Sequence, residues 1–199
     1  HHTLWAPPFR TFARDPGSFR PEAVTQDITK GVDMKECVPS VIGREILLEN
    51  TWIWVTRKDV SFGEVPEDYF VLELPDYVAI VARTPCGRIP LVKQYRPAVE
   101  QFTLELPAGT VDKGETPTEC AVRELWEEVG LAVRTITQIG AYWADTGRLG
   151  NLQHVFLAET EEIPEFSQPE LEVSYVTAQQ LERMIVDGEF RMSLHISAL

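Results

Sequence analysis

Residues 109–131 read GTVDKGETPTECAVRELWEEVGL and contain the best-marked helix of the chain. Thr116 is a favourable N-cap, Pro117 suits the first helical position, and Glu119 stands where a capping box needs a carboxylate. Gly130 is a typical residue to follow the last helical turn. The apolar residues between these ends recur at helical spacing, at Ala121, Val122, Leu125 and Val129. The sequence therefore predicts a helix that begins after Thr116 and ends at Gly130.

Three glutamates occupy one face of this predicted helix. Glu124, Glu127 and Glu128 have the spacing i, i+3 and i+4, which places their side chains next to one another. Carboxylates so close together repel, and the negative end of the helix dipole adds to that repulsion. Arg123 neutralises only part of the charge. A hard cation such as Mg²⁺, or alternatively Mn²⁺, would turn the repulsion into binding energy, so we expect these three glutamates to be metal ligands.

The residues before the helix suit the same purpose. Pro107 ends a predicted strand, and Gly109 permits a close approach of the backbone. The carbonyl group of Ala108 is therefore expected to be a further metal ligand. Glu115 precedes the helix, where its carboxylate can bridge to Arg123 and fix the loop.

This segment resembles the Nudix box. All the fixed positions of the box match, at Gly109, Glu115, Arg123, Glu124, Glu127, Glu128 and Gly130. The resemblance implies a Nudix fold, which is an α/β/α sandwich with a mixed β-sheet, here preceded by an N-terminal arm and antiparallel β-strands. It also implies hydrolysis of a nucleoside diphosphate linked to another group.

The resemblance implies roles for the box residues. In the family, glutamates at the positions of Glu124 and Glu128 hold Mg²⁺, Glu127 assists, and an arginine at the position of Arg123 orients a glutamate. The ions offset the charge of the diphosphate and acidify a water molecule, which attacks phosphorus while a carboxylate accepts its proton. The predicted catalytic residues in the box are thus Arg123, Glu127 and Glu128.

A second resemblance concerns residues 94–97, Gln-Tyr-Arg-Pro, and residues 105–109, Glu-Leu-Pro-Ala-Gly. Both are similar to the branch of ADP-ribose and nucleotide-sugar pyrophosphatases. The branch implies that Arg96 contacts phosphate, and that Glu105 belongs to the substrate-binding set. It also implies a homodimer whose N-terminal parts are exchanged or packed across the dyad.

The same branch implies a place for the base of the nucleotide. Trp52, and Tyr69 or Phe70, lie in segments that stack an adenine in these enzymes. Trp52 and Trp54 alternate on a predicted strand, so at most one of them faces a base and the other belongs to the core or to a dimer interface.

The general base of the branch lies on an acidic loop before the last strand. Three residues ahead of Glu172, where a glutamate is usual, this chain has Pro169. Glu170 is therefore our predicted base, followed by Glu172 and then by Glu165. Residues 145–150, Asp-Thr-Gly-Arg-Leu-Gly, also depart from the proline-bearing loop of many ADP-ribose hydrolases.

The pattern along the chain predicts its organisation. Residues 1–43 form a largely irregular arm, residues 44–75 an N-terminal β subdomain for dimerisation and base binding, and residues 76–199 the Nudix domain. The predicted strands are 46–60 and 69–74, joined by a turn at 63–67, and then 77–83, 89–95, 102–106, 132–143, 153–159 and 171–176. A second amphipathic helix is predicted over 178–186, and a last helix begins within 191–199.

Charge and composition exclude some functions. The formal net charge is −13, which leaves no basic footprint for nucleic acid or anionic lipid. No apolar run approaches the roughly 18–20 residues that span a bilayer, and no secretory signal is visible. The three scattered cysteines indicate a reducing cytoplasm. A phosphate substrate would be repelled by this chain unless cations or placed arginines reverse the local field.

We expect an enzyme that cleaves the diphosphate of ADP-ribose, or of a related nucleoside diphosphate sugar, to a nucleoside monophosphate and a sugar phosphate. Three alternatives stay open. The chain could be a Nudix enzyme for dinucleoside polyphosphates, a nucleoside triphosphate or coenzyme A. It could be a catalytically silent module that senses a nucleotide sugar, or an acidic domain that binds Mg²⁺ without a substrate. Arg96 could equally form a surface ion pair.

Overall fold

The computed structural model describes residues 38–62, 65–162 and 169–199. The chain divides between Val38 and Pro39, and everything below concerns the second unit, residues 39–199. Most of the predicted N-terminal arm lies outside the described residues. Its last six positions are described, and four of them, residues 40–43, already belong to a strand that begins at Ser40.

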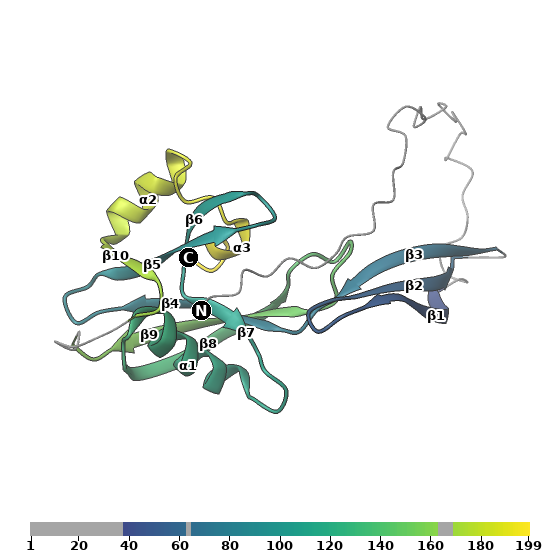
Figure 1. The fold of residues 1–199 in the computed structure, drawn as a ribbon, viewed down its shortest axis with the longest axis horizontal. Coiled ribbons are helices and arrows are strands. Elements are labelled where there is room, and N and C mark those ends of the chain that lie inside the picture. Colours follow the sequence, from purple (N-terminus) through teal and green to yellow (C-terminus); the bar gives the residue numbers. More distant parts are fainter. Residues whose placement is uncertain (1–37, 63–64, 163–168) are drawn as a thin grey trace, which may run out of the picture. The chain divides into compact units, whose positions relative to one another are not determined.

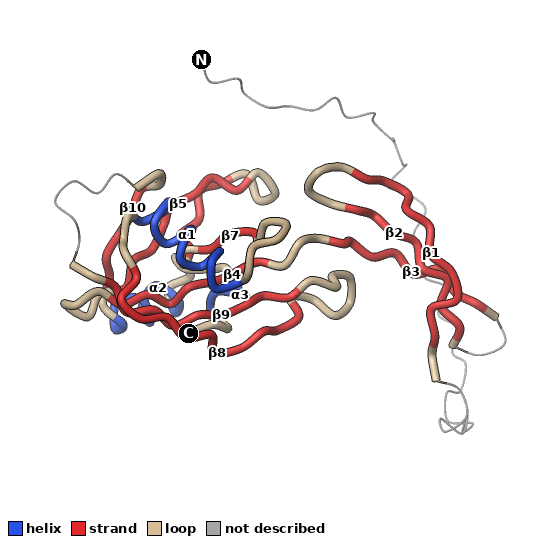
Figure 2. The backbone as a smooth tube through the Cα atoms, turned by 90° about the horizontal axis from the view of Figure 1, so that it is seen from below, coloured by secondary structure: helices blue, strands red, loops and turns tan. Residues whose placement is uncertain are grey.

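The first three strands form an antiparallel sheet in the order β1-β2-β3 (Figures 1 and 2). They are β1 (Ser40–Glu49), β2 (Trp54–Ser61) and β3 (Pro66–Glu73). The prediction of one strand over 46–60 was therefore wrong, because the chain reverses at Asn50. The Asn50 side chain accepts hydrogen bonds from the backbone N–H groups of Trp52 and Ile53, at 2.8 and 2.9 Å, a turn that asparagine commonly makes. Trp52 thus lies in the turn rather than on a strand.

A mixed sheet with the order β7-β4-β9-β8 follows. Strand β4 (Tyr77–Arg83) pairs with β9 (Leu152–Thr160) in parallel, and the flanking strands β7 (Ala108–Thr110) and β8 (Val133–Trp143) are antiparallel to their neighbours. The three-residue β7 is too short for its pattern to be recognised in the sequence.

A further antiparallel sheet has the order β10-β5-β6. Its strands are β5 (Ile89–Arg96), β6 (Gln101–Glu105) and β10 (Glu172–Val176). The predicted strands 89–95, 102–106 and 171–176 agree with these to within one residue at each end.

The helices cover opposite sides of these strands (Figure 1). Helix α1 (Pro117–Val129) packs in one buried cluster, whereas α2 (Ala178–Val186) and α3 (Ser193–Ile196) surround another. Neighbouring residues on a strand point to opposite faces, and accordingly Leu91 belongs to the second cluster while Val92 belongs to the first. Strand β5 is therefore buried on both faces, and the predicted α/β/α sandwich with a mixed sheet is confirmed.

The helix ends agree with the sequence. Thr116 and Glu119 form the predicted capping box of α1, and Gly130 ends that helix with φ 71°. Helix α2 has the predicted bounds, while the predicted last helix is the short α3. Within the described ranges, no helix combines the length and the hydropathy that crossing a bilayer requires.

Candidate active site

Strand β7 and helix α1 lie in contact, and Gly109 makes that contact possible. A Cβ atom added at Gly109 would lie 1.9 Å from Oε1 of Glu124, which is far inside the van der Waals distance. Only glycine therefore lets the Glu124 carboxylate lie against this strand. The predicted close approach at Gly109 is a feature of the structure.

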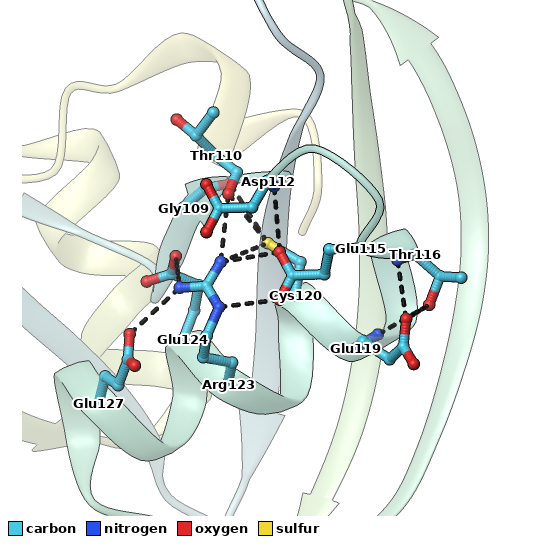
Figure 3. Close-up of polar contacts among 10 residues, drawn as sticks. All are labelled: Gly109, Thr110, Asp112, Glu115, Thr116, Glu119, Cys120, Arg123, Glu124 and Glu127. Carbon is cyan, nitrogen blue, oxygen red and sulfur yellow. Dashed lines mark hydrogen bonds and ion pairs between the residues drawn. The ribbon is translucent and has the colours of Figure 1, made fainter.

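The guanidinium of Arg123 lies among three box carboxylates (Figure 3). It donates to both oxygens of Glu115, at 2.8 and 2.9 Å, which is the bridge that the sequence predicts. It also donates to Glu124 at 2.6 Å and to Glu127 at 3.1 Å. Hydrogen bonds from Arg123 lower the pKa of Glu115 to about 2, and hydrogen bonding to Glu115 raises the pKa of Arg123.

Glu128 has different surroundings from the other box acids. Its side chain is buried, and its two oxygens accept from the backbone N–H of Ala108 at 3.0 Å and from Nε2 of Gln94 at 2.5 Å. Neither partner carries a charge. Burial raises the pKa of Glu128 to about 7, and burial also raises the pKa of Glu124.

The oxygen atoms at this site are of the kinds that bind a hard divalent cation. Carboxylate oxygens of Glu124, Glu127 and Glu128 and a carbonyl oxygen of Ala108 are ligands that Mg²⁺ and Mn²⁺ prefer. The raised pKa values of Glu124 and Glu128 mean that burial disfavours their charged forms, which a nearby cation would favour. Among the residues that the structure describes, no group of three or more His, Cys, Asp or Glu side chains is already arranged to hold a metal ion. The positive charge among these carboxylates is the Arg123 guanidinium.

Arg96 and Glu105 form a second charged pair next to the box. Arg96 donates to the two oxygens of Glu105 at 2.7 and 2.6 Å, and Thr103 donates to Glu105 at 2.6 Å. Burial opposes ionisation of Glu105, which is 1% exposed, but these hydrogen bonds outweigh it and lower its pKa. The negative charge of Glu128 also helps to raise the pKa of Arg96, so the two sites influence each other.

Both members of this pair line a cleft of 730 Å³. One wall is the β5–β6 hairpin, and the other is the segment that follows α2. Its apolar lining includes Val99, Phe102, Leu104 and Met192. With 41% of its side chain exposed, Arg96 is accessible from this cleft.

The residues predicted for base stacking belong to the N-terminal sheet, with Tyr69 on β3 and Trp52 in the turn before β2. Trp52 is 64% exposed in the β1–β2 turn. The hydroxyl of Tyr69 donates to the carbonyl of Gly147, and the guanidinium of Arg148 lies 4.7 Å from the centre of the Tyr69 ring. In the described part of the chain, no hydrogen bond, ion pair or ring contact joins Trp52 or Tyr69 to the box.

The candidates for the general base differ in their surroundings. The backbone N–H of Glu170 donates to the carbonyl of Glu127 at 3.0 Å, which places Glu170 beside the last turn of α1, and its side chain is exposed. Glu172 forms an ion pair with Lys93, whose Nζ donates to its Oε2 at 2.9 Å. Glu165 lies outside the described residues.

Two residues that contact the predicted site, Gln94 and Thr103, were not predicted from the sequence to have a role there. Gln94 donates to Glu128, and Thr103 donates to Glu105. A signal for Gln94 was available, since residues two apart on a strand share a face and Gln94 stands two positions before Arg96. That Gln94 binds Glu128 of α1 could not be predicted from the strand pattern.

Comparisons with known proteins agree with this geometry. The NUDIX domain family model matches residues 73–194. An ADP-ribose pyrophosphatase of Bacillus subtilis is 37% identical over 163 residues, which cover 78% of this chain and 88% of that protein. A methanol dehydrogenase activator of Bacillus methanolicus is 33% identical over 89 residues, covering 45% of this chain and 48% of its own length.

A solved structure described as an ADP compounds hydrolase has the same fold. The TM-score is 0.68 at 22% sequence identity, and the match covers 80% of this chain and 89% of the other. The family model spans more than half of the chain and includes the box on β7 and α1. This chain therefore belongs to the Nudix hydrolase family.

Proposed function

We propose that this Nudix hydrolase cleaves the diphosphate of ADP-ribose, or of a closely related nucleoside diphosphate sugar, to a nucleoside monophosphate and a sugar phosphate. The observation that carries the proposal is the bond between Gln94 and Glu128. It joins the acidic face of α1 to β5 two residues from Arg96, so the acidic face and a partly exposed guanidinium belong to one site. The ADP-ribose pyrophosphatase of which this chain covers 88% supports the choice of substrate.

Glu124, Glu127, Glu128 and the carbonyl of Ala108 would hold Mg²⁺, or alternatively Mn²⁺. The chemistry that such an ion supplies is neutralisation of the diphosphate and acidification of the attacking water. Arg123 keeps the carboxylates of Glu124 and Glu127 in place through bonds of 2.6 and 3.1 Å.

The remaining roles fall to the residues around the box. Arg96, held in a fixed orientation by Glu105, binds a phosphate group of the substrate. Glu170 accepts a proton from the water that attacks phosphorus, and the departing phosphate leaves with the bonding electron pair. Its exposed side chain and its position beside α1 favour Glu170 over Glu172, which is paired with Lys93.

We also propose that the protein is a homodimer in which Trp52 stacks on the base of the nucleotide. Strand β1 is an edge strand, and it exposes Ile42, Ile46 and Leu48 by 60, 57 and 50%. An exposed apolar edge of this kind is a typical place for another chain to pack. Trp52 lies in the turn at the end of this strand, whereas one face of Tyr69 already contacts Arg148.

The test is a hydrolysis screen with Mg²⁺ over ADP-ribose, ADP-glucose, UDP-glucose and GDP-mannose, with products separated by chromatography. We expect AMP and ribose 5-phosphate from ADP-ribose. Release of products only from nucleoside triphosphates, dinucleoside polyphosphates or coenzyme A would assign the chain to another Nudix branch. A rise in thermal stability with ADP-ribose and Mg²⁺ but no product would indicate the silent sensor.

Glu128→Gln is the matched control for this screen. We expect its turnover to fall by at least about 100-fold, because the neutral amide is a poor ligand for a hard cation. Its stability should stay within about 1 kcal/mol of the wild type, since the amide can still bond with Ala108 and Gln94 and no longer buries a charge. Turnover close to that of the wild type would contradict the site assignment.

A further inference from the structure

A buried histidine near the end of the chain contacts the loop that leads into the box. His195 lies on α3 and is fully buried. Its Nδ1 accepts a hydrogen bond of 3.0 Å from the backbone N–H of Leu106, 89 residues earlier in the chain. Because Nδ1 accepts, the proton of the neutral ring is on Nε2, and Nε2 has no partner within the described residues. His195 falls just beyond the residues that the family model matches.

The segment that this histidine contacts is the four-residue corner 105–108, between β6 and β7. The corner begins with Glu105, which holds Arg96, and ends with Ala108, whose N–H donates to Glu128. Pro107 has no N–H, so past the end of β6 the backbone donors of the corner are those of Leu106 and Ala108.

The two donors of the corner are bound by side chains of two different helices. Ala108 is bound by Glu128 of α1 at 3.0 Å, and Leu106 by His195 of α3 at 3.0 Å. The carbonyl of Pro107 between them accepts from the N–H of Ile80 on β4 at 2.9 Å. A displacement of Leu106 would therefore also displace Glu105, which holds Arg96, and the N–H of Ala108, which binds Glu128.

A hydrogen bond and core packing fix the position of helix α3. The buried Gln153 of β9 donates to the carbonyl of Leu194 at 3.0 Å, and Phe190 and Ile196 pack in the second core cluster. Burial lowers the pKa of His195 to about 4, against the opposing influence of Glu105 and with the support of Arg96, so the ring is a neutral acceptor near pH 7.

We propose that His195 is a positioning residue of the Nudix site, which acts by fixing the corner that carries Glu105 and Ala108. The role rests on the proposed function, because the corner matters only if Arg96 and the box act on one substrate. A residue outside a site can fix the backbone that positions the site's side chains. Such a residue affects turnover because it controls the geometry of those side chains.

The test compares three substitutions of His195. His195→Leu keeps an apolar side chain but has no acceptor, His195→Asn places an oxygen near the position of Nδ1, and His195→Gln places one near Nε2. With ADP-ribose and saturating Mg²⁺, we expect kcat of the Leu and Gln variants to fall by about 10-fold or more, because small displacements of catalytic groups have effects of this size. The Asn variant should keep kcat within about 3-fold of the wild type, because it restores the acceptor for Leu106.

Phe190→Leu is the matched control for loss of packing. Phe190 is 1% exposed in the same core cluster, but among the described residues no hydrogen bond joins its side chain to the corner. This variant should lose thermal stability while its kcat stays within about 2-fold of the wild type, because only packing is removed. If Phe190→Leu lowers kcat as much as His195→Leu does, general loosening of α3 explains the effect and the proposal is wrong.

Amide hydrogen exchange separates this proposal from the proposed function. In His195→Leu we expect the amides of Leu106 and Ala108 to exchange at least about 10-fold faster, since both belong to the same corner. Faster exchange at Leu106 alone, with Ala108 and kcat unchanged, would overturn the positioning role. If the wild type cleaves no diphosphate, the proposed function fails, while the exchange of Ala108 still shows whether His195 controls the corner. If the Leu variant does not fold, the contrast between Asn and Gln decides.

Discussion

The glutamates of the box differ in which residue, if any, neutralises their negative charge. The sequence predicts repulsion among three glutamates on one face of a helix, and Arg123 relieves it for two of them, Glu124 and Glu127. Glu128 is buried, and its hydrogen-bond partners among the described residues are uncharged, which is why its pKa rises to about 7 while that of Glu115, bonded to Arg123, falls to about 2. Of the three, Glu128 is the carboxylate that most needs a cation from outside the chain.

Arg96 can be tested separately as a phosphate ligand and as a structural ion pair. Arg96→Ala leaves the buried Glu105 without its bidentate partner, and we expect the free energy of unfolding to fall by about 2 kcal/mol. The KM for ADP-ribose should rise roughly 10-fold as a phosphate contact is lost. Chemical denaturation and steady-state kinetics measure the two effects.

The double variant Arg96→Ala with Glu105→Gln distinguishes the two roles. Replacing the buried carboxylate by an amide removes the unpaired charge, so most of the lost stability should return while KM stays high. If KM returns together with stability, Arg96 is only a surface ion-pair residue, which is the alternative that the sequence left open.

At the scale of elements, the approach of β7 to α1 depends on one glycine. In Gly109→Ala the new methyl group would displace the Glu124 carboxylate, because a Cβ atom at residue 109 would lie 1.9 Å from its Oε1. We expect kcat for ADP-ribose to fall at least about 100-fold, because a displaced ligand disturbs the whole site. Gly150→Ala is the matched control, since a Cβ atom there meets nothing within 4 Å, and its kcat should stay within about 2-fold. Equal activity of the two variants would show that Glu124 has no place in turnover.

The elements differ in how well their own residues predict them. Helix α1 was predicted at both ends because its capping box and its terminal glycine are contacts between residues a few positions apart. The single strand predicted over 46–60 was wrong because Asn50 bonds the N–H groups of Trp52 and Ile53, and this turn interrupts an otherwise strand-like composition. The surroundings of Tyr69 were also not predictable, since Gly147 and Arg148 approach it from a distant loop.

At the scale of the whole molecule, the buried His195 makes stability depend on pH. Its pKa is about 4 in the folded protein and about 6.5 when unfolded, so between these values the unfolded chain binds more protons. This histidine therefore lowers the free energy of unfolding as the pH falls through that window. Glu128, whose pKa is raised to about 7, acts in the opposite direction, so variants must be compared at each pH.

We expect His195→Asn to gain about 2 kcal/mol of stability relative to the wild type between pH 7.5 and pH 5, because asparagine does not titrate. Urea denaturation at both pH values measures the difference. A constant difference between the two proteins would mean that His195 is not buried as a neutral ring.

The proposed homodimer is a prediction about the edge strand β1. Ile46→Lys places a charge among exposed apolar side chains, and we expect the protein to become a monomer in light scattering coupled to size-exclusion chromatography. The same substitution at Ile139, which is 52% exposed on β8, should leave the dimer intact. Dissociation by the β8 variant alone would place the interface on the other sheet. The cytoplasmic location stays a prediction.

The sequence by itself determined the family, the α/β/α class, the bounds of α1 and the sharing of one helix face by Glu124, Glu127 and Glu128. The family and its fold class follow from the resemblance of residues 109–131 to the Nudix box. The bounds of α1 and its acidic face follow from residues close together in the chain, where helix geometry and capping decide the outcome. Only the tertiary structure decided that Gln94 binds Glu128 and that His195 binds Leu106. Those partners are 34 and 89 residues apart, and side chains so distant meet only where the packing of two cores on either side of the sheets brings them together.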